Sequence, residues 1–405
     1  MKPSNSSRGR GIHIIDDIND LNVDELSIIS RYVTNPLLIN GYKFDLRIYV
    51  VVTCYEPLRI YVYKEGLARF ASETYTAKFN KNNKYMHLTN YSINKKNEHF
   101  VQNESAENDD FGFKWSLSAF CKHLETVGIN MSLLWSRIFD VLIKTLACGE
   151  HYVLQAMKKN QMHRQNCYEV FGFDILLDSD LKPWLVEVNL SPSLSSDSPL
   201  DLTIKSHLIL DTFNMIQVKR FDRKKESLNK IKYRSKGGPL PGGGPSSAKH
   251  KSYKQESSLC GQFQIPPTGA NEVFVSNYHV NPQLNQILDR ILEEYPDEFG
   301  HLEEPLKKSS MLKFRDILNE SAIEYNRLGE FVRIFPSKHS KPYEKYFSGL
   351  FGTRMLNRIV HKVLFTNEIL PYEKLGNKVQ SGNAEERKPK VTDPKNLKYD
   401  IDVPQ

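Results

Sequence analysis

Two kinds of hydrophobic spacing alternate along the first 222 residues. Runs rich in Val, Ile, Leu, Phe and Tyr predict strands at residues 46–53, 58–62, 169–177 and 184–189. Apolar residues three and four positions apart predict helices at residues 113–126 and 133–147. Residues 103–110 are polar and acidic, which predicts an exposed loop. The alternation predicts a mixed α/β (α+β) fold for residues 1–222.

The composition changes sharply after this region. Residues 219–256 hold twelve Lys or Arg against three acids, around a segment rich in Gly and Pro, which predicts a flexible basic linker over residues 223–270. Helical spacing returns at residues 284–294 and 313–328 and predicts a helical extension over residues 271–373. Residues 374–405 are polar and charged, which predicts a disordered tail.

Composition and charge narrow the classes of function. The chain has no run of eighteen apolar residues, so we expect no membrane span. Its five cysteines are scattered without a Cys/His spacing typical of zinc sites. The net charge of +7 favours an acidic partner. Basic residues are not interleaved with aromatic ones in a motif typical of nucleic-acid binding, so we expect no nucleic-acid partner.

A predicted β-hairpin at residues 171–189 carries the first candidate chemistry. Because side chains alternate along a strand, Glu187 and Asn189 share one face while Val186 and Val188 point into the core. An antiparallel partner strand brings Asp174 beside them. Two carboxylates and an amide oxygen are ligands that Mg²⁺ prefers. The alternative is a solvated strand face, but the strongly apolar residues around these acids favour a metal site.

A second strand combines charged and apolar residues. Lys43, Asp45 and Arg47 are spaced by two and project from one face, whereas Phe44 and Leu46 take the other. Two cations and an acid on one face are suited to binding phosphate and ribose. An amphipathic edge strand that faces water has the same pattern, and the residues alone leave both interpretations open.

Two loops add weaker signals. A short Gly-rich loop with cations spans residues 7–12, and glycine lets backbone N–H groups approach phosphate oxygens. A polar cluster follows at residues 87–92. Taken alone, each loop is more typical of an ordinary turn or loop than of a binding site.

The order of these motifs resembles that of ATP-grasp enzymes, specifically the tubulin tyrosine ligase-like family and its polyglutamylase members. The motifs that carry the resemblance are Lys2-Pro3, Arg8-Gly9, Ser30-Arg31-Tyr32-Val33, Lys43-Phe44-Asp45-Leu46-Arg47, His87-Leu88-Thr89-Asn90-Tyr91-Ser92, Phe171-Gly172-Phe173-Asp174 and Trp184-Leu185-Val186-Glu187-Val188-Asn189. The resemblance covers residues 2–221 and returns at residues 329–337, which are similar to the family's helical extension. It implies two antiparallel-sheet subdomains that sandwich ATP. The family's N-terminal domain precedes Lys2-Pro3, so we expect it to be missing here.

The resemblance also implies roles for individual residues. The nucleotide-binding set is Lys2, Arg8, Gly9, Ser30, Arg31, Tyr32, Val33, Lys43, Phe44, Asp45, Thr89 and Asn90. The Mg²⁺ ligands are Asp174, Glu187 and Asn189, and the catalytic set is Lys43, Arg47 and Glu187. The set that binds the incoming glutamate is Arg69, Tyr91, Ser92, Lys114 and Lys205.

The implied activity is tubulin polyglutamylation that depends on ATP and Mg²⁺. A tail carboxylate of tubulin attacks the γ-phosphate of ATP to form an acyl phosphate, and the amine of free L-glutamate then attacks the acyl group. We expect a monomer in the cytoplasm and cytoskeleton, at microtubules and at those of the cilium and basal body, with the helical extension as a microtubule-binding region. Alternatives are a ligase that adds glycine or tyrosine, a ligase that modifies another acidic protein, and a microtubule-binding scaffold with a vestigial ATP site.

Overall fold

The computed structural model describes two parts of the chain. The first is residues 1–217 without residues 5, 7–8, 18, 20–25, 77–79, 104 and 161–166. The second is residues 317–347 without residues 319, 322 and 338, together with Asn357 and Val360. The predicted linker over residues 223–270, the predicted helix at residues 284–294 and the predicted tail over residues 374–405 lie outside these described residues, as does Arg8.

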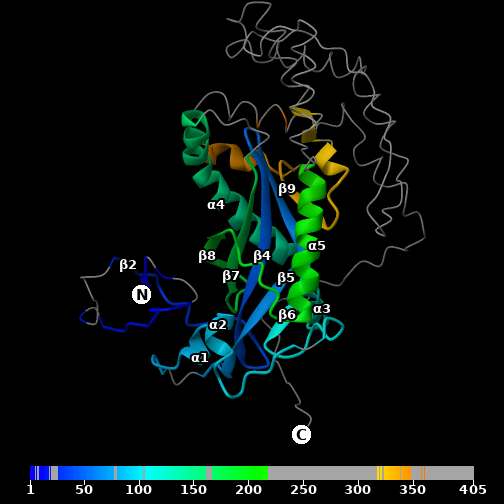
Figure 1. The fold of residues 1–405 in the computed structure, drawn as a ribbon. Coiled ribbons are helices and arrows are strands. Elements are labelled where there is room, and N and C mark those ends of the chain that lie inside the picture. The colour runs from blue at the N-terminus through cyan, green and yellow to red at the C-terminus, as the bar shows by residue number, and fades with distance from the viewer. Residues whose placement is uncertain are drawn as a thin grey trace, which may run out of the picture.

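Within the described residues, seven strands form one antiparallel sheet around a long central hairpin. The hairpin consists of β4 (Tyr42–Tyr55) and β5 (Leu58–Thr74). The strand order is β6-β5-β4-β7-β8, where β6 is Lys114–Ser116, β7 is Glu169–Leu177 and β8 is Pro183–Leu190. Two short strands, β3 (Leu38–Ile39) and β9 (Phe331–Phe335), pair with β4 and β5 respectively. A separate two-stranded ribbon consists of β1 (Lys2–Pro3) and β2 (Ser27–Ile28), and it lies to the left of the sheet in Figure 1.

Helices cover both faces of the sheet. On one face, α3 (Leu117–Thr126) and α4 (Met131–Lys159) enclose the larger core, which includes Phe44 and Ile48 of β4. On the other face, α5 (Pro199–Ile216) packs against Tyr49 and Val51 of the same strand. Figure 1 shows α4 and α5 on opposite sides of the sheet. Because helices cover both faces of β4, nearly all its residues are buried, which explains its continuous apolar run. The expected mixed α/β class with antiparallel sheets is confirmed.

Two short helices complete the polar end of the sheet. They are α1 (Lys84–His87) and α2 (Tyr91–Asn94), and both contact β5. Their positions beside the lower end of the central hairpin are visible in Figure 1. The side chain of Asn83 caps α1 by accepting a hydrogen bond from the backbone N–H of Tyr85, at 3.1 Å.

Some predicted boundaries differ from the structure for identifiable reasons. The strand predicted at residues 169–177 is β7 without change, whereas β5 continues twelve residues beyond the predicted end at residue 62. Residues 114–116 form β6 instead of helix because they pair with β5. Ser116 then caps α3, accepting a hydrogen bond from the backbone N–H of Ala119 at 2.9 Å, so that helix begins at Leu117.

The predicted helical extension contains both helix and strand. Its described residues between 317 and 325 are helical, as the spacing predicts. Residues 331–335, by contrast, form β9, which pairs with β5 at Ile60–Tyr63. Phe331, Ile334 and Phe335 are buried there, because pairing with β5 places them in the two cores. The expectation that residues 329–337 continue a helical extension is therefore wrong at β9.

The expectation that Val186 and Val188 point into the core is also wrong. Their side chains are 39% and 37% exposed. In the described part of the chain β8 is the last strand of the sheet and pairs with β7 alone. The pairing is irregular between Asp174 and Ile175, which makes Val186 the extra residue of a bulge.

Candidate functional site

A band of charged residues crosses the sheet beside the start of α5. The strand register places Glu187, Asp174 and Arg47 in one row across β8, β7 and β4. A second row contains Asp45, Arg69 and Lys114 on β4, β5 and β6. Leu46, which lies between Asp45 and Arg47 on β4, packs into the core behind the sheet. The sheet therefore gathers six charged side chains from five strands. Of the predicted trio, this set includes Asp45 and Arg47 but not Lys43.

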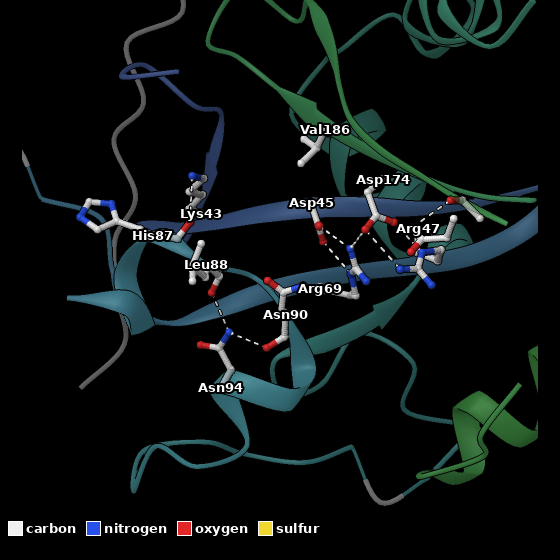
Figure 2. A network of polar contacts seen from close by, with 12 residues as sticks. Lys43, Asp45, Arg47, Arg69, His87, Leu88, Asn90, Asn94, Asp174 and Val186 are labelled. Atoms are coloured by element: carbon white, nitrogen blue, oxygen red, sulfur yellow. Dashed lines mark hydrogen bonds and ion pairs between the residues drawn. The ribbon is translucent and has the colours of Figure 1, made fainter. Parts of the chain in front are cut away.

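Four members of this band form one ion-pair network (Figure 2). The Arg69 guanidinium bonds both oxygens of Asp45, with 2.8 Å between Nε and Oδ1, and its Nη2 lies 2.8 Å from Asp174 Oδ2. Arg47 bonds Asp174 from the other side, with 2.5 Å from Nε to Oδ1 and 3.2 Å from Nη2 to Oδ2. Each carboxylate is thus held by at least one planar guanidinium, a geometry that fixes both partners.

Burial makes this network electrostatically strong. Asp174, Asp45 and Arg69 are 3%, 6% and 8% exposed. Burial alone raises the pKa of Asp174, but the charges of Arg69 and Arg47 outweigh it and hold that pKa below its usual value. The Asp174 carboxyl is therefore ionised at neutral pH, as a metal ligand must be.

The three predicted metal ligands lie on neighbouring positions of β7 and β8. Asp174 and Glu187 are cross-strand partners, and Asn189 pairs with Gly172, so Glu187 and Asn189 share a face as expected. The Asn189 amide donates a hydrogen bond to the carbonyl of Gly172, at 3.1 Å. Glu187 is exposed and makes no hydrogen bond or ion pair within the described residues.

These donors fit Mg²⁺ held jointly with phosphate oxygens. Among the residues that the structure describes, no group of three or more His, Cys, Asp or Glu is placed to hold a metal by itself. Two carboxylates and an amide oxygen supply only part of an octahedral shell, and Mg²⁺ ordinarily completes such shells with phosphate and water.

Lys43 makes a separate set of polar contacts. Its ammonium is buried and donates to the carbonyl of His87 at 3.0 Å and to the hydroxyl of Tyr32 at 3.2 Å. Burial lowers the pKa of Lys43 to about 8, against the opposing charge of Asp45 and with a further lowering by Lys2. The Tyr32 hydroxyl is 2.8 Å from Nδ1 of His87, which connects Tyr32 of the expected nucleotide-binding set to this lysine. Its neighbours Ser30 and Arg31 are exposed.

Two residues of the N-terminal segment contact the site, Lys2 at β8 and Gly9 at the start of α2. Lys2 donates from Nζ to the carbonyl of Val186 on β8, at 3.1 Å. Gly9 has a φ of +75°, and a Cβ there would lie 2.9 Å from Oδ1 of Asn90 and 2.4 Å from Cδ1 of Ile93. The glycine is therefore required both by its backbone conformation and by its contact with the start of α2.

Asn94 fixes the loop that carries Thr89 and Asn90. Its fully buried amide donates to the carbonyls of Leu88 and Asn90 at 2.7 and 3.1 Å, as Figure 2 shows. Its Oδ1 accepts from the backbone N–H of Ser72 on β5, at 2.8 Å. Sequence reasoning missed Asn94, which lies two residues beyond the predicted polar cluster at residues 87–92.

A second cluster of cations surrounds Asp201 on α5. Lys114 Nζ lies 2.6 Å from Asp201 Oδ2, and Lys205 Nζ lies 2.9 Å from Asp201 Oδ1. Lys114 also lies over the ring of Tyr91, 4.1 Å from its centroid. Of the five residues expected to bind glutamate, the structure thus joins Lys114, Lys205 and Tyr91. Arg69 lies opposite Lys114 in register within the ion-pair network, and Ser92 follows Tyr91 in α2.

Sequence reasoning also missed Asp201. The available signal was Ser198-Pro199-Leu200-Asp201, a helix-start pattern in which the side chain of Ser198 accepts from the backbone N–H of Asp201, at 3.2 Å. The pattern predicts a helix start, but it does not show that the same carboxylate binds two lysines.

The model of the tubulin-tyrosine ligase family matches residues 1–226. This range includes all the strands and helices that build the charged band. The chain belongs to the tubulin-tyrosine ligase family.

Individual members of the tubulin-tyrosine ligase family match over most of the chain. It is 37% identical over 380 residues to tubulin polyglutamylase TTLL5 of Mus musculus, covering 93% of this chain and 26% of the relative. It is 36% identical to tubulin polyglutamylase ttll-5 of Caenorhabditis elegans, covering 89% and 47%. It is 37% identical to tubulin monoglutamylase TTLL4 of Homo sapiens, covering 86% and 27%. The chain therefore spans between a quarter and a half of the length of these relatives.

One further property concerns membranes. Among the helices that the structure describes in this family member, none is both long enough and apolar enough to cross a bilayer.

Proposed function

We propose that this protein is an ATP- and Mg²⁺-dependent ligase that adds glutamate to glutamate side chains in tubulin C-terminal tails. The observation that carries the proposal is the charged band across the sheet, in which ionised Asp174 faces Glu187 on one side and two arginines on the other. Such a band supplies both kinds of group that phosphoryl transfer requires, namely oxygen ligands for a metal and cations for the transferred phosphate.

Bound ATP and Mg²⁺ would supply an activated phosphoryl group whose negative charge the metal partly neutralises. Asp174, Glu187 and Asn189 would hold the metal. Lys43, with its amine between Tyr32 and the carbonyl of His87, would contact a phosphate oxygen. Arg47 is the cation next to the metal-binding carboxylate and 13% exposed in its side chain, so it is placed to meet the reacting acyl group and the γ-phosphate.

The incoming amino acid would bind on the β6 side of the band. Free glutamate carries two carboxylates, and Lys114 and Lys205 lie together there beside Tyr91. In the reaction a tail carboxylate displaces ADP from the γ-phosphate to form an acyl phosphate, and the glutamate amine then displaces inorganic phosphate and loses a proton to form the amide. The cations stabilise the charge that collects on the phosphoryl oxygens.

The assignment of tubulin rests on the relatives. Three of them are named tubulin polyglutamylases or monoglutamylases, and their identity extends over most of this chain. The net charge of +7 is complementary to an acidic tail. We therefore expect the protein to act in the cytoplasm, at microtubules of the cytoskeleton, including those of the cilium and basal body.

The test is incorporation of labelled glutamate into microtubules by the 405-residue protein with ATP and Mg²⁺. We expect Glu187→Gln to reduce incorporation by roughly 100-fold, because the substitution keeps the shape of the side chain but removes one metal ligand. Glu125→Gln, which changes an exposed carboxylate on α3, is the charge-matched control and should incorporate as much label as the wild type.

Two results would contradict the proposal. Equal labelling by the wild type and Glu187→Gln would remove Glu187 from the metal site. Labelling with glycine but not with glutamate would replace the proposed donor, since a glycine site has no need for Lys114 and Lys205 as partners of a side-chain carboxylate.

A further inference from the structure

The carboxylate of Asp201 is enclosed by the two lysines of the proposed amino-acid site. Asp201 is 1% exposed, so it has no surface to offer a substrate. Its Oδ2 lies 2.6 Å from Lys114 Nζ on β6, and its Oδ1 lies 2.9 Å from Lys205 Nζ one helical turn further along α5. One carboxylate therefore holds two ammonium groups that come from different elements.

The rest of the environment fixes Asp201 in turn. The hydroxyl of Ser198, the residue that caps α5, donates to Asp201 Oδ2 at 3.0 Å. Lys205 also donates to the carbonyl of Ser195, in the segment that connects β8 to α5. The carboxylate thus sits at the junction of β6, the start of α5 and the connection from the metal-binding strand.

Lys114, Lys205 and Asp201 together carry one net positive charge, which is available to a ligand. Two ammonium groups and one carboxylate sum to a single net positive charge. Without Asp201, the two ammonium groups would face each other uncompensated in a buried site, and repulsion would separate them. A ligand carboxylate that binds between them would then meet neither at hydrogen-bonding distance.

We propose that Asp201 is a positioning residue, which holds Lys114 and Lys205 at the separation needed to bind one carboxylate of the incoming amino acid. This inference rests on the proposed function, since it takes the two lysines as part of the glutamate site. It adds a residue that never touches the substrate and predicts that amino-acid binding depends on its charge.

The electrostatics give this role a distinctive pH dependence. Burial lowers the pKa of Lys114, while the charge of Asp201 opposes that change. The other charged groups near Lys114 are Lys205, Asp197 and its cross-strand partner Arg69, with the Tyr91 ring beside it. Removing the Asp201 charge lets burial and Lys205 lower the Lys114 pKa further, so part of the lysine loses its proton as pH rises.

The experiment measures equilibrium binding of L-glutamate to the 405-residue protein by calorimetry, with ATP binding measured in parallel. We expect Asp201→Asn to weaken glutamate binding by roughly tenfold near pH 8.5 and by only about threefold near pH 6.5, because a change of one pKa unit corresponds to tenfold. ATP binding should stay within about twofold of the wild type, since no residue of the nucleotide set lies on α5 or β6.

Two controls separate positioning from a purely structural role. Asp211→Asn removes a carboxylate from the same helix far from the lysines and should bind glutamate like the wild type at each pH. Ser198→Ala removes the hydroxyl that donates to Asp201 but leaves all three charges, so its loss of glutamate binding should not grow as pH rises. Asp201→Glu keeps the charge on a longer side chain, so it should remove the pH dependence while binding stays weaker than in the wild type.

The binding measurements test the role of Asp201 without requiring ligase activity. Unchanged glutamate binding in folded Asp201→Asn, or an equal loss in Asp211→Asn, overturns the positioning role. If Asp201→Asn does not fold, Asp201→Glu decides the question, since wild-type binding by that variant would exclude a requirement for this geometry. A wild type that binds glutamate but transfers none to microtubules refutes the proposed function and leaves the role of Asp201 intact.

Discussion

The guanidinium of Arg69 bonds both carboxylate oxygens of Asp45 across the central hairpin. The two residues are cross-strand partners on β4 and β5, and each is buried. Because Arg69 also reaches Asp174 on β7, a single side chain connects the strand expected to bind the nucleotide with the strand expected to bind the metal. The integrity of the candidate site therefore depends on a residue between its two halves.

Replacing Arg69 should be strongly destabilising. In Arg69→Met the carboxylate of Asp45 loses its guanidinium partner in a buried environment, and removal of one member of a buried ion pair typically costs about 3–5 kcal/mol. We expect the free energy of unfolding, measured by urea denaturation, to fall by that amount. The matched control is Lys64→Met on the same strand, whose ion pair with Glu330 is more than half exposed and should contribute at most about 1 kcal/mol.

A comparable loss in both variants would show that burial of the Arg69 network adds nothing to stability. The same pair of proteins also tests the site, because only Arg69→Met should weaken binding of a fluorescent ATP analogue.

Glu324 should anchor the second described part of the chain to the sheet. It binds Arg59 at 2.9 Å, Tyr61 at 2.7 Å and Thr53 at 2.9 Å, all on the central hairpin. Arg59 is 2% exposed, so Glu324→Gln leaves a buried cation whose remaining carboxylate, that of Glu320, is 3.7 Å away, and it should reduce the free energy of unfolding by about 3 kcal/mol. Hydrogen exchange should show the backbone amides of β9 losing protection, because β9 follows Glu324 and pairs with β5.

The control for this anchor is Glu320→Gln. Its carboxylate lies 3.7 Å from the same guanidinium and is more exposed, so its loss should be clearly smaller. Equal exchange rates for β9 in the two variants would contradict an anchoring role specific to Glu324.

Strand periodicity predicted the local part of the site. It placed Lys43 and Asp45 on the strand face opposite to that of Phe44, and it placed Asp174 beside Glu187. Alternation along a strand and pairing within a short hairpin depend only on neighbouring residues. Val186 was placed wrongly for the same reason. Alternation assumes a regular strand with a covered face, whereas β8 has a bulge and lies at the edge of the described sheet.

The non-local part could not be read from spacing. The pairing of Arg69 with Asp45 depends on a register that shifts three times along the hairpin. The partners Arg59 and Glu324 are 265 positions apart, on either side of the predicted linker. The local sequence around Asp201 predicts only a helix start, and the folded sheet is what brings β6 and Lys114 to it. Such contacts follow from tertiary packing, which periodicity does not encode.

Glu150 should make stability depend on pH. This residue on the inner side of α4 is 2% exposed, and its Oε1 has no hydrogen-bond partner within the described residues. Burial and the nearby Glu56 raise its pKa to about 7, against a smaller opposing effect of Lys158. The folded state then binds more protons than the unfolded state between about pH 4.5 and 7, so stability is highest below this window and is lost as pH rises through it.

Glu150→Gln should remove this dependence. We expect the variant to gain on the order of 1–2 kcal/mol over the wild type near pH 8 and almost nothing near pH 4.5, measured by urea denaturation. Glu125→Gln, at an exposed position on α3, should show no such pH-dependent difference. A gain in Glu150→Gln that is the same at both pH values would exclude titration of Glu150 as its cause.

Gly9 should control how closely the N-terminal segment approaches the nucleotide site. In Gly9→Ala the new Cβ would lie 2.4 Å from Cδ1 of Ile93 and 2.9 Å from Oδ1 of Asn90, so the segment and these two side-chain ends must shift relative to one another. Gly128→Ala is a close control, because Gly128 has a similar positive φ of +81° but nothing within 4 Å of its Cβ position. Both variants therefore carry the same backbone strain, of roughly 1 kcal/mol, and only Gly9→Ala adds a displacement. We expect Gly9→Ala alone to weaken binding of a fluorescent ATP analogue, by about tenfold, because displaced donors no longer meet the phosphates. Equal ATP affinity in the two variants would show that the approach of this segment to Asn90 does not contribute to nucleotide binding.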